Sequence, residues 1–143
     1  MDADQLLQSV PLFHGLDKKH LAVLAKLCHE RSFGPGDAIV NEGESGIGLF
    51  IVGSGRVEVV QKRGANEQQL RTMVTGEVFG EIGLLTDHPR TASVRALEPT
   101  TCLVLTAWSF QEALDGSPEI AKALLKTVAQ WLVETEDRAS ARL

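Results

Sequence analysis

Several features that would place a protein at a membrane or on nucleic acid are missing from this chain. No apolar run approaches the roughly 18–20 residues that a helix needs to cross a bilayer, and Met1–Val10 lacks the basic segment and long apolar run of a signal peptide. Basic residues are in the minority, with 14 Lys and Arg against 19 Asp and Glu and a net charge of −5. This balance argues against non-specific binding to nucleic acid or to an anionic membrane. We therefore expect a cytoplasmic protein without membrane contact.

The side chains that build metal centres and nucleophilic sites are also few. Cys28 and Cys102 lie far apart on apolar faces, which is typical of reduced core thiols. The chain has four histidines, which are His14, His20, His29 and His88. They show no ligand spacing, so we interpret them as surface or turn residues. Since no nucleophile elbow, phosphate loop or metal-protease motif occurs either, the sequence predicts no metal, no cofactor and no enzyme activity.

What the chain does contain is enough apolar sequence, 43% of 143 residues, to bury the core of one domain. Between residues 33 and 105, short β-branched runs alternate with glycines. The runs are AIV, GLFIV, RVEVVQ, QLRTMV, SVRAL and CLVLT. Gly36, Gly43 and Gly55 fall between them, GSG at 53–55 predicts a tight turn, and RGANEQ at 63–68 predicts a polar hairpin loop. Many short strands with regular turns indicate an antiparallel jelly roll.

Helical patterns flank the predicted strands on both sides. Asp17 is a candidate cap for an N-terminal helix, and Thr106 for a first C-terminal helix. Ser117 and Pro118 are a typical start for a longer second helix. We interpret Trp108 as a core residue at the start of the first C-terminal helix.

The fold class that follows is mainly β with flanking helices. We expect a β-roll of the double-stranded jelly-roll type, with an N-terminal helical segment and two C-terminal helices. In a single domain of residues 1–143, residues 1–31 would be helical, residues 32–106 would form the roll, and residues 107–143 would form the C-terminal helices.

One stretch, FGEIGLLTDHPRTASVRA at residues 79–96, interrupts the predicted strands. Its leucine spacing fits one helical turn, whose unpaired N–H groups and dipole favour an anion. Gly80 lets a ligand approach the backbone, and Arg90 offers a positive fork suited to a phosphate. Glu81 supplies two acceptor oxygens suited to a sugar hydroxyl. Together these groups predict a receptor for a singly charged sugar phosphate.

The slightly longer stretch GEVFGEIGLLTDHPRTASVRA resembles the phosphate-binding cassette of cyclic nucleotide-binding domains. This family is found in catabolite activator proteins, cyclic-nucleotide-dependent kinases and hyperpolarisation-gated channels. The shared pattern is Phe-Gly-Glu, two small or apolar residues, a short loop, and then Arg followed by Ala, Ser or Thr and by Ala. The upstream FGPGDAIVNEGESGIGLFIVGSGRVEVV matches as well, so the resemblance covers nearly the whole chain.

The resemblance implies a role for each cassette residue. Glu81 would bind the ribose 2′-hydroxyl, and Arg90 would pair with the cyclic phosphate. Backbone N–H groups near Gly80, Ile82 and Ala92 would complete the anion site, while Leu84 would pack beneath the cassette. The predicted ligand-binding residues are Phe79, Gly80, Glu81, Ile82, Leu84, Arg90, Thr91 and Ala92.

Simpler interpretations of the same residues stay open. Glu81 and Arg90 could form a structural ion pair, worth only about 0–1 kcal/mol at a surface, and Gly80 could be a turn glycine. Trp131 or Leu132 on the last helix could close over a bound base, or could instead pack in the core or at a dimer seam.

The implied ligand is cAMP, with cGMP ranked second because cAMP receptors are more prevalent in the family. Thr91 does not decide between them. A threonine at this place often accompanies cGMP binding, yet channel members that carry RTASVRA respond to cAMP.

The implied function is a sensor that couples ligand capture by the cassette to repositioning of the C-terminal helices. The alternative is the sensor half of a catabolite-activator-type transcription regulator without its DNA-binding domain. An enzyme on a β-roll is a third hypothesis, supported by architecture alone. The expected partner is a cyclic nucleotide; a homodimer through the C-terminal helix and a separate effector protein are further candidates. Direct binding to nucleic acid is not expected, because the net charge is negative and no helix-turn-helix follows the long helix.

Overall fold

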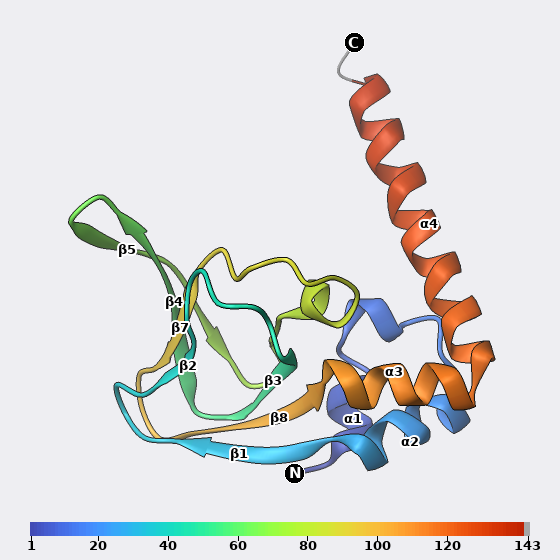
Figure 1. Ribbon diagram of the computed structural model, residues 1–143, viewed down its shortest axis with the longest axis horizontal. Coiled ribbons are helices and arrows are strands. Elements are labelled where there is room, and N and C mark those ends of the chain that lie inside the picture. The colour runs from blue at the N-terminus through green and yellow to red at the C-terminus, as the bar shows by residue number, and fades with distance from the viewer. Residues whose placement is uncertain (142–143) are drawn as a thin grey trace.

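The computed structural model describes residues 1–141, which form an antiparallel β-roll with helices along one side (Figure 1). The strands are β1 (His29–Phe33), β2 (Ala38–Val40), β3 (Gly48–Ser54), β4 (Arg56–Arg63), β5 (Asn66–Val74), β6 (Val78–Phe79), β7 (Ser93–Ala96) and β8 (Thr100–Thr106). The helices are α1 (Ala3–Leu7), α2 (Lys18–Leu27), α3 (Ala107–Gly116) and α4 (Pro118–Ala141), with short 3-10 helices η1 (Pro11–Phe13) and η2 (Glu81–Leu84). Residues 142 and 143 of the predicted C-terminal region lie outside the described residues.

The strands of the described chain form two four-stranded sheets. Their orders are β1-β8-β3-β6 and β2-β7-β4-β5, and every pair is antiparallel. The turn between β3 and β4 depends on Gly55, whose φ is +94° and where a Cβ would lie 2.5 Å from the Pro99 carbonyl oxygen. This architecture confirms the predicted fold class, a β-roll with an N-terminal helical segment and two C-terminal helices.

Side-chain alternation along the central strand β3 separates two cores. Phe50 and Val52 belong to the cluster inside the roll, whereas Leu49 and Ile51 belong to the cluster that packs against the helices. Strand β8, which pairs with β3, alternates in the same way. One pair of strands therefore connects the interior of the roll to the helical layer.

The predicted helix caps are present. The Asp17 carboxylate accepts a hydrogen bond of 2.9 Å from the His20 N–H, and the Thr106 hydroxyl accepts one of 3.2 Å from the Ser109 N–H. Helix α4 begins at Pro118 as expected. These local signals therefore position the helices that flank the roll.

Helix α4 is anchored through its first half. Ile120 and Leu124 are buried against the helical core, Trp131 packs partly against it, and the C-terminal part of the helix rises away from the roll (Figure 1). Within residues 1–141, no helix is both long and apolar enough to cross a bilayer.

Three details differ from the sequence-based expectations. Strand β1 begins at His29, inside the segment 1–31 expected to be helical; its side chains are mostly exposed, so no apolar alternation marked it. The loop expected at 63–68 shrinks to a two-residue turn, because polar strand β5 pairs with β4 as far as Arg63 and Asn66. Trp108 is 75% exposed, since Phe110 and Ala113 occupy the inward face of α3.

Candidate functional site

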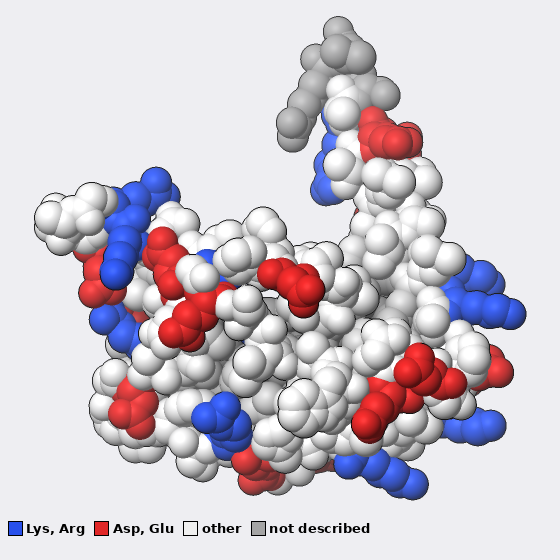
Figure 2. All heavy atoms as spheres, in the orientation of Figure 1, with Lys and Arg blue, Asp and Glu red and all other residues white. Residues whose placement is uncertain are grey.

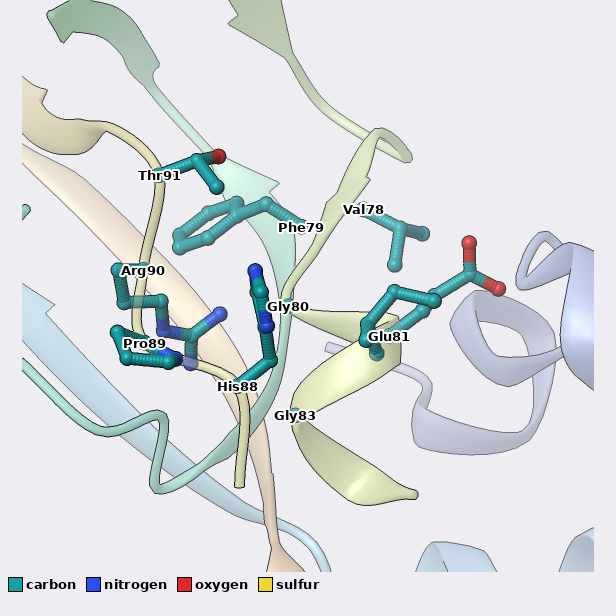
Figure 3. Close-up of a pocket in the computed structure, with 10 residues that line it drawn as sticks. Val78, Phe79, Gly80, Glu81, Gly83, His88, Pro89, Arg90 and Thr91 are labelled. Carbon is teal, nitrogen blue, oxygen red and sulfur yellow. The ribbon is translucent and has the colours of Figure 1, made fainter. Parts of the chain in front are cut away.

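A hollow of about 320 Å³ opens beside β6 and η2 (Figure 3). Its wall comes from two segments of the predicted cassette: residues 78–83, and the loop residues 88–91 that precede β7. The volume lies within the range of about 300–1,000 Å³ that is usual for small-molecule sites. The hollow is thus large enough for a nucleotide-sized ligand and lies where the sequence predicts one.

The backbone of Arg90 is clamped in place on both sides. Its N–H donates to the Glu44 carbonyl at 2.9 Å, and its carbonyl accepts from the Gly43 N–H at 2.8 Å. An isolated bridge between Ser45 and Pro89 adds to the same contact. The guanidinium therefore extends from a fixed point into the wall of the hollow.

The Arg90 guanidinium lacks a negatively charged partner. Its Nη2 donates to the Gly48 carbonyl at 2.8 Å, while Nε is buried without an acceptor. Across residues 1–141, no carboxylate lies within ion-pair distance of it. Burial lowers the pKa of the Arg90 guanidinium below its usual range, but arginine stays charged at neutral pH. A desolvated, unneutralised cation at the wall of a hollow is an electrostatic site for an anion.

Glycines make room for this guanidinium. Gly80 has φ +86°, a left-handed conformation, and a Cβ there would lie 2.6 Å from the Gly48 carbonyl oxygen and collide with Arg90 Nη1. A Cβ at Gly46 would lie 3.0 Å from Arg90 Nε. Gly80 is thus required both by the turn into η2 and by the close approach of Arg90.

Glu81 points away from Arg90, toward the N-terminal segment (Figure 3). Its Oε2 accepts a hydrogen bond of 3.0 Å from the Leu12 backbone N–H in η1. The alternative of a structural ion pair between Glu81 and Arg90 is therefore not what the structure shows. The carboxylate predicted to bind ribose instead holds a backbone amide of a segment 69 residues earlier in the sequence.

Phe79 and Leu84 anchor the segment that carries the site in the two cores. The Phe79 ring stacks on Phe50, with centroids 5.1 Å apart and planes 1° apart, and Leu84 is buried in the core that faces the helices. The two side chains fix η2 between the interior of the roll and the helical layer.

The remaining predicted residues lie at the rim. Ile82 is 59% exposed, and Thr91 is exposed at the wall of the hollow. Ala92 is half-buried and does not line the hollow. The first intrahelical bond of η2 runs from the Gly83 N–H to the Gly80 carbonyl at 3.0 Å, so the amides of Glu81 and Ile82 precede it and are free of intrahelical partners.

His88 also lines the hollow, although the sequence indicated only a turn residue. Its imidazole projects into the space between Arg90 and Gly80 (Figure 3). The available signal was its place in the cassette loop, two positions before Arg90. Spacing rules for metal ligands could not find it, because no second histidine lines the hollow.

Other candidate chemistries find no support in residues 1–141. No group of three or more His, Cys, Asp or Glu side chains in that range is placed to hold a metal ion. Both cysteines are free thiols, and burial raises the pKa of Cys28 to about 12 and that of Cys102 to about 11. Thiols with such pKa values are poor nucleophiles at neutral pH.

Neither candidate for covering a base lines the hollow. Trp131 packs partly against the helical core, and Leu132 is 59% exposed on the part of α4 that stands away from the roll.

Comparison with known proteins agrees with this geometry. The family described as "Cyclic nucleotide-binding domain" matches residues 30–117. Human cGMP-dependent protein kinase 2 is 32% identical over 139 residues, which are 95% of this chain and 18% of the kinase. The chain spans only 10–18% of the length of the curated kinase relatives that it matches.

Two solved structures are similar over most of the chain. The N-terminal domain of a transcriptional regulator from Streptomyces coelicolor A3(2) is 33% identical, with a TM-score of 0.86 and 94% of each chain covered. Catabolite Activator Protein from Thermus thermophilus is 30% identical, with a TM-score of 0.70, over 92% of this chain and 62% of that one. The chain belongs to the cyclic nucleotide-binding domain family.

Proposed function

We propose that this chain is a receptor for a cyclic nucleotide, which binds in the hollow between η2 and the loop before β7. The observation that carries the proposal is the unneutralised guanidinium of Arg90, whose buried Nε lacks an acceptor. A cyclic phosphodiester supplies one negative charge and several acceptor oxygens, which is the complement that Arg90 requires. The amides of Glu81 and Ile82 at the start of η2 offer further donors.

Glu81 supplies the sugar contact in this proposal by exchanging partners. In the free protein it accepts from the Leu12 N–H at 3.0 Å. In this proposal the carboxylate turns to the ribose 2′-hydroxyl and releases this amide, so nucleotide binding and the contact with η1 compete for one side chain. Ligand binding therefore shifts the population toward a state in which η1 is no longer held by η2.

The same exchange gives a route to the C-terminal helix. The turn after η1 packs against α4, and a Cβ at Gly15 would lie 2.9 Å from the Thr127 hydroxyl and 3.6 Å from the Ala123 carbonyl oxygen. When Glu81 releases Leu12, the restraint on this turn weakens, and α4 gains freedom to reposition. The free segment of α4 is then the output of the sensor.

We expect cAMP as the ligand, with cGMP as the alternative. The cGMP alternative is supported by the names of the kinase relatives and by the exposed Thr91 hydroxyl at the rim. The decisive assay is a thermal-shift comparison of cAMP, cGMP and the linear 5′-monophosphates. A cyclic ligand at 100 times its Kd should add about 2.7 kcal/mol to the free energy of unfolding. No stabilisation by any cyclic nucleotide at millimolar concentration would refute the proposal.

Gly46→Ala should weaken nucleotide binding without unfolding the protein. The added methyl lies 3.0–3.1 Å from three atoms of the Arg90 guanidinium, which has to turn from its rotamer at a cost of about 0.5–1.5 kcal/mol. We expect the Kd, measured by isothermal titration calorimetry, to rise about threefold to tenfold. Gly116→Ala is the control, because a Cβ there meets no atom within 4 Å. Equal Kd values for the two variants would contradict the claim that the space at Gly46 positions the Arg90 guanidinium for binding.

A second candidate function is favoured by the comparison with the transcriptional regulator. This chain and that N-terminal domain cover 94% of each other, so the domain is also a candidate for the sensor half of a DNA-binding regulator. A gel-shift assay with duplex DNA and saturating cyclic nucleotide, at physiological salt, tests direct binding. Binding to DNA by residues 1–143 would favour this function over a sensor that acts on a separate effector protein.

The exposed stripe on α4 is the proposed contact with a second copy of the chain. Leu125, Val128 and Leu132 are 70%, 37% and 59% exposed and are spaced by three and four residues, the period of a coiled-coil seam. In Figure 2 the lower part of α4 shows uncharged side chains on the side toward the roll and basic residues on the outer side, while charges of both signs appear farther along the helix. A parallel pair of α4 helices would bury this stripe.

Leu125→Glu combined with Leu132→Glu should convert the dimer to a monomer, because charged side chains at the seam would face each other. Light scattering after gel filtration measures the mass directly. Gln130→Glu adds charge at an exposed α4 position outside the stripe and should leave the dimer intact. A monomeric mass for the unmodified chain would remove the homodimer from the proposal.

A further inference from the structure

We propose that His88 is a second ligand-contacting residue of the hollow, and that its imidazole binds the phosphate together with Arg90 and makes affinity rise as pH falls. This inference rests on the proposed function, because it names a further contact of the same site. His88 lines the hollow with Arg90, and its ring projects toward the same opening (Figure 3). The side chain is exposed and makes no hydrogen bond with any of residues 1–141. It is therefore free to donate to a ligand.

The loop that carries His88 is held firmly enough to aim it. The following Pro89 forms a bridge with Ser45, and the His88 backbone N–H donates to the Thr86 hydroxyl at 3.3 Å. Arg90 is clamped by two backbone bonds to the segment 43–44. Two nitrogen-bearing side chains, two positions apart on one fixed loop, thus line the same hollow.

The charges around His88 decide the sign of the pH effect. Arg90 is the cation that shares its hollow. Glu81 is turned to Leu12, and the Glu44 carboxylate lies 3.4 Å from the Asn41 amide. The adjacent Asp87 is exposed. Among the described residues, no carboxylate forms an ion pair with His88 or Arg90.

A bound cyclic phosphate would bring a negative charge next to the imidazole. Its negative charge favours protonation of the imidazole, so the complex binds more protons than the free protein wherever histidine titrates, between about pH 5 and 8. By linkage, affinity has to increase as pH falls through this range. A phosphodiester keeps its single charge in this range, whereas a linear monophosphate titrates near pH 6. With a cyclic ligand, any change of affinity with pH therefore comes from groups of the protein.

The test is calorimetric titration of cAMP, or of cGMP if cAMP does not bind, at pH 6.0 and pH 8.0. We expect the wild-type Kd to be about threefold to tenfold lower at pH 6.0. His88→Ala should bind more weakly at pH 6.0 and show no pH dependence. His88→Lys should restore tight binding at both pH values, because its charge does not titrate in this range. Asp87→Asn should keep the pH dependence, since that carboxylate is not the group that titrates.

His29→Ala is the matched control, because His29 is exposed on β1 and does not line the hollow. It should behave as the wild type at both pH values. If His88→Ala binds cyclic nucleotide as tightly as the wild type at pH 6.0, or keeps the pH dependence, the contact is refuted and the proposed receptor function stands. If the wild type binds no cyclic nucleotide at either pH, the receptor function is refuted, and the contact with it.

Discussion

Arg90→Met is expected to weaken cyclic-nucleotide binding strongly while leaving the free protein at least as stable as the wild type. Truncating one partner of a buried charge pair costs about 2–5 kcal/mol, which corresponds to a rise in Kd of about 30-fold to 4,000-fold. The free protein gains, because methionine removes a desolvated cation whose Nε has no acceptor. Calorimetry measures the affinity, and urea unfolding measures the stability.

Arg95→Met is the matched control for this prediction. Arg95 lies on the neighbouring strand β7 and pairs with Glu58 at 3.0 Å and Glu67 at 3.2 Å. The hydrogen bond that Arg95 donates to Glu58 raises the pKa of Arg95, whereas burial lowers that of Arg90. Arg95→Met should lose a little stability and keep its affinity. Tight binding by Arg90→Met, or loss of binding by Arg95→Met, would show that the phosphate is held elsewhere.

Glu81→Ala is expected to have two separable effects. It removes the carboxylate that accepts from the ribose hydroxyl, a bond worth about 1.5–3 kcal/mol, and it also removes the Leu12 bond that the wild type gives up on binding, so the Kd should rise by at most about 10-fold to 150-fold. The preference for a cyclic nucleotide over its 2′-deoxy analogue should disappear with it. The free protein should also lose stability, about 1–3 kcal/mol, because the Leu12 N–H is left without its acceptor in a part-buried position.

Glu77→Ala separates these two effects. The Glu77 carboxylate likewise accepts from a backbone N–H, that of Val74 at 2.8 Å, but it does not line the hollow. This variant should lose stability and still discriminate against the 2′-deoxy ligand. If Glu81→Ala also keeps that discrimination, then Glu81 only secures η1 and does not bind the sugar.

The elements with strong local signals were predictable from sequence. The caps at Asp17 and Thr106, the tight turn at Gly55 and the apolar strands β3 and β8 each depend on neighbouring residues, and each was found where expected. Strand β1 was missed, because an edge strand with exposed side chains carries no alternation of apolar residues.

The site was predictable in its composition but not in its contacts. The cassette pattern alone predicts that Gly80, Glu81 and Arg90 belong to one site, and the structure places all three at the hollow. Their assignment as ligand-binding residues stays a prediction. The bond from Leu12 to Glu81 joins residues 69 positions apart, and no local rule detects a pairing that only the packing of η1 against η2 creates.

The most direct test is a crystal structure of the protein with a saturating cyclic nucleotide. We predict the phosphate in the hollow, with an oxygen within about 2.7–2.9 Å of the Arg90 guanidinium, and Glu81 turned from Leu12 to the ribose. A phosphate bound outside the hollow, or an Arg90 that still contacts only the Gly48 carbonyl, would contradict the central claim.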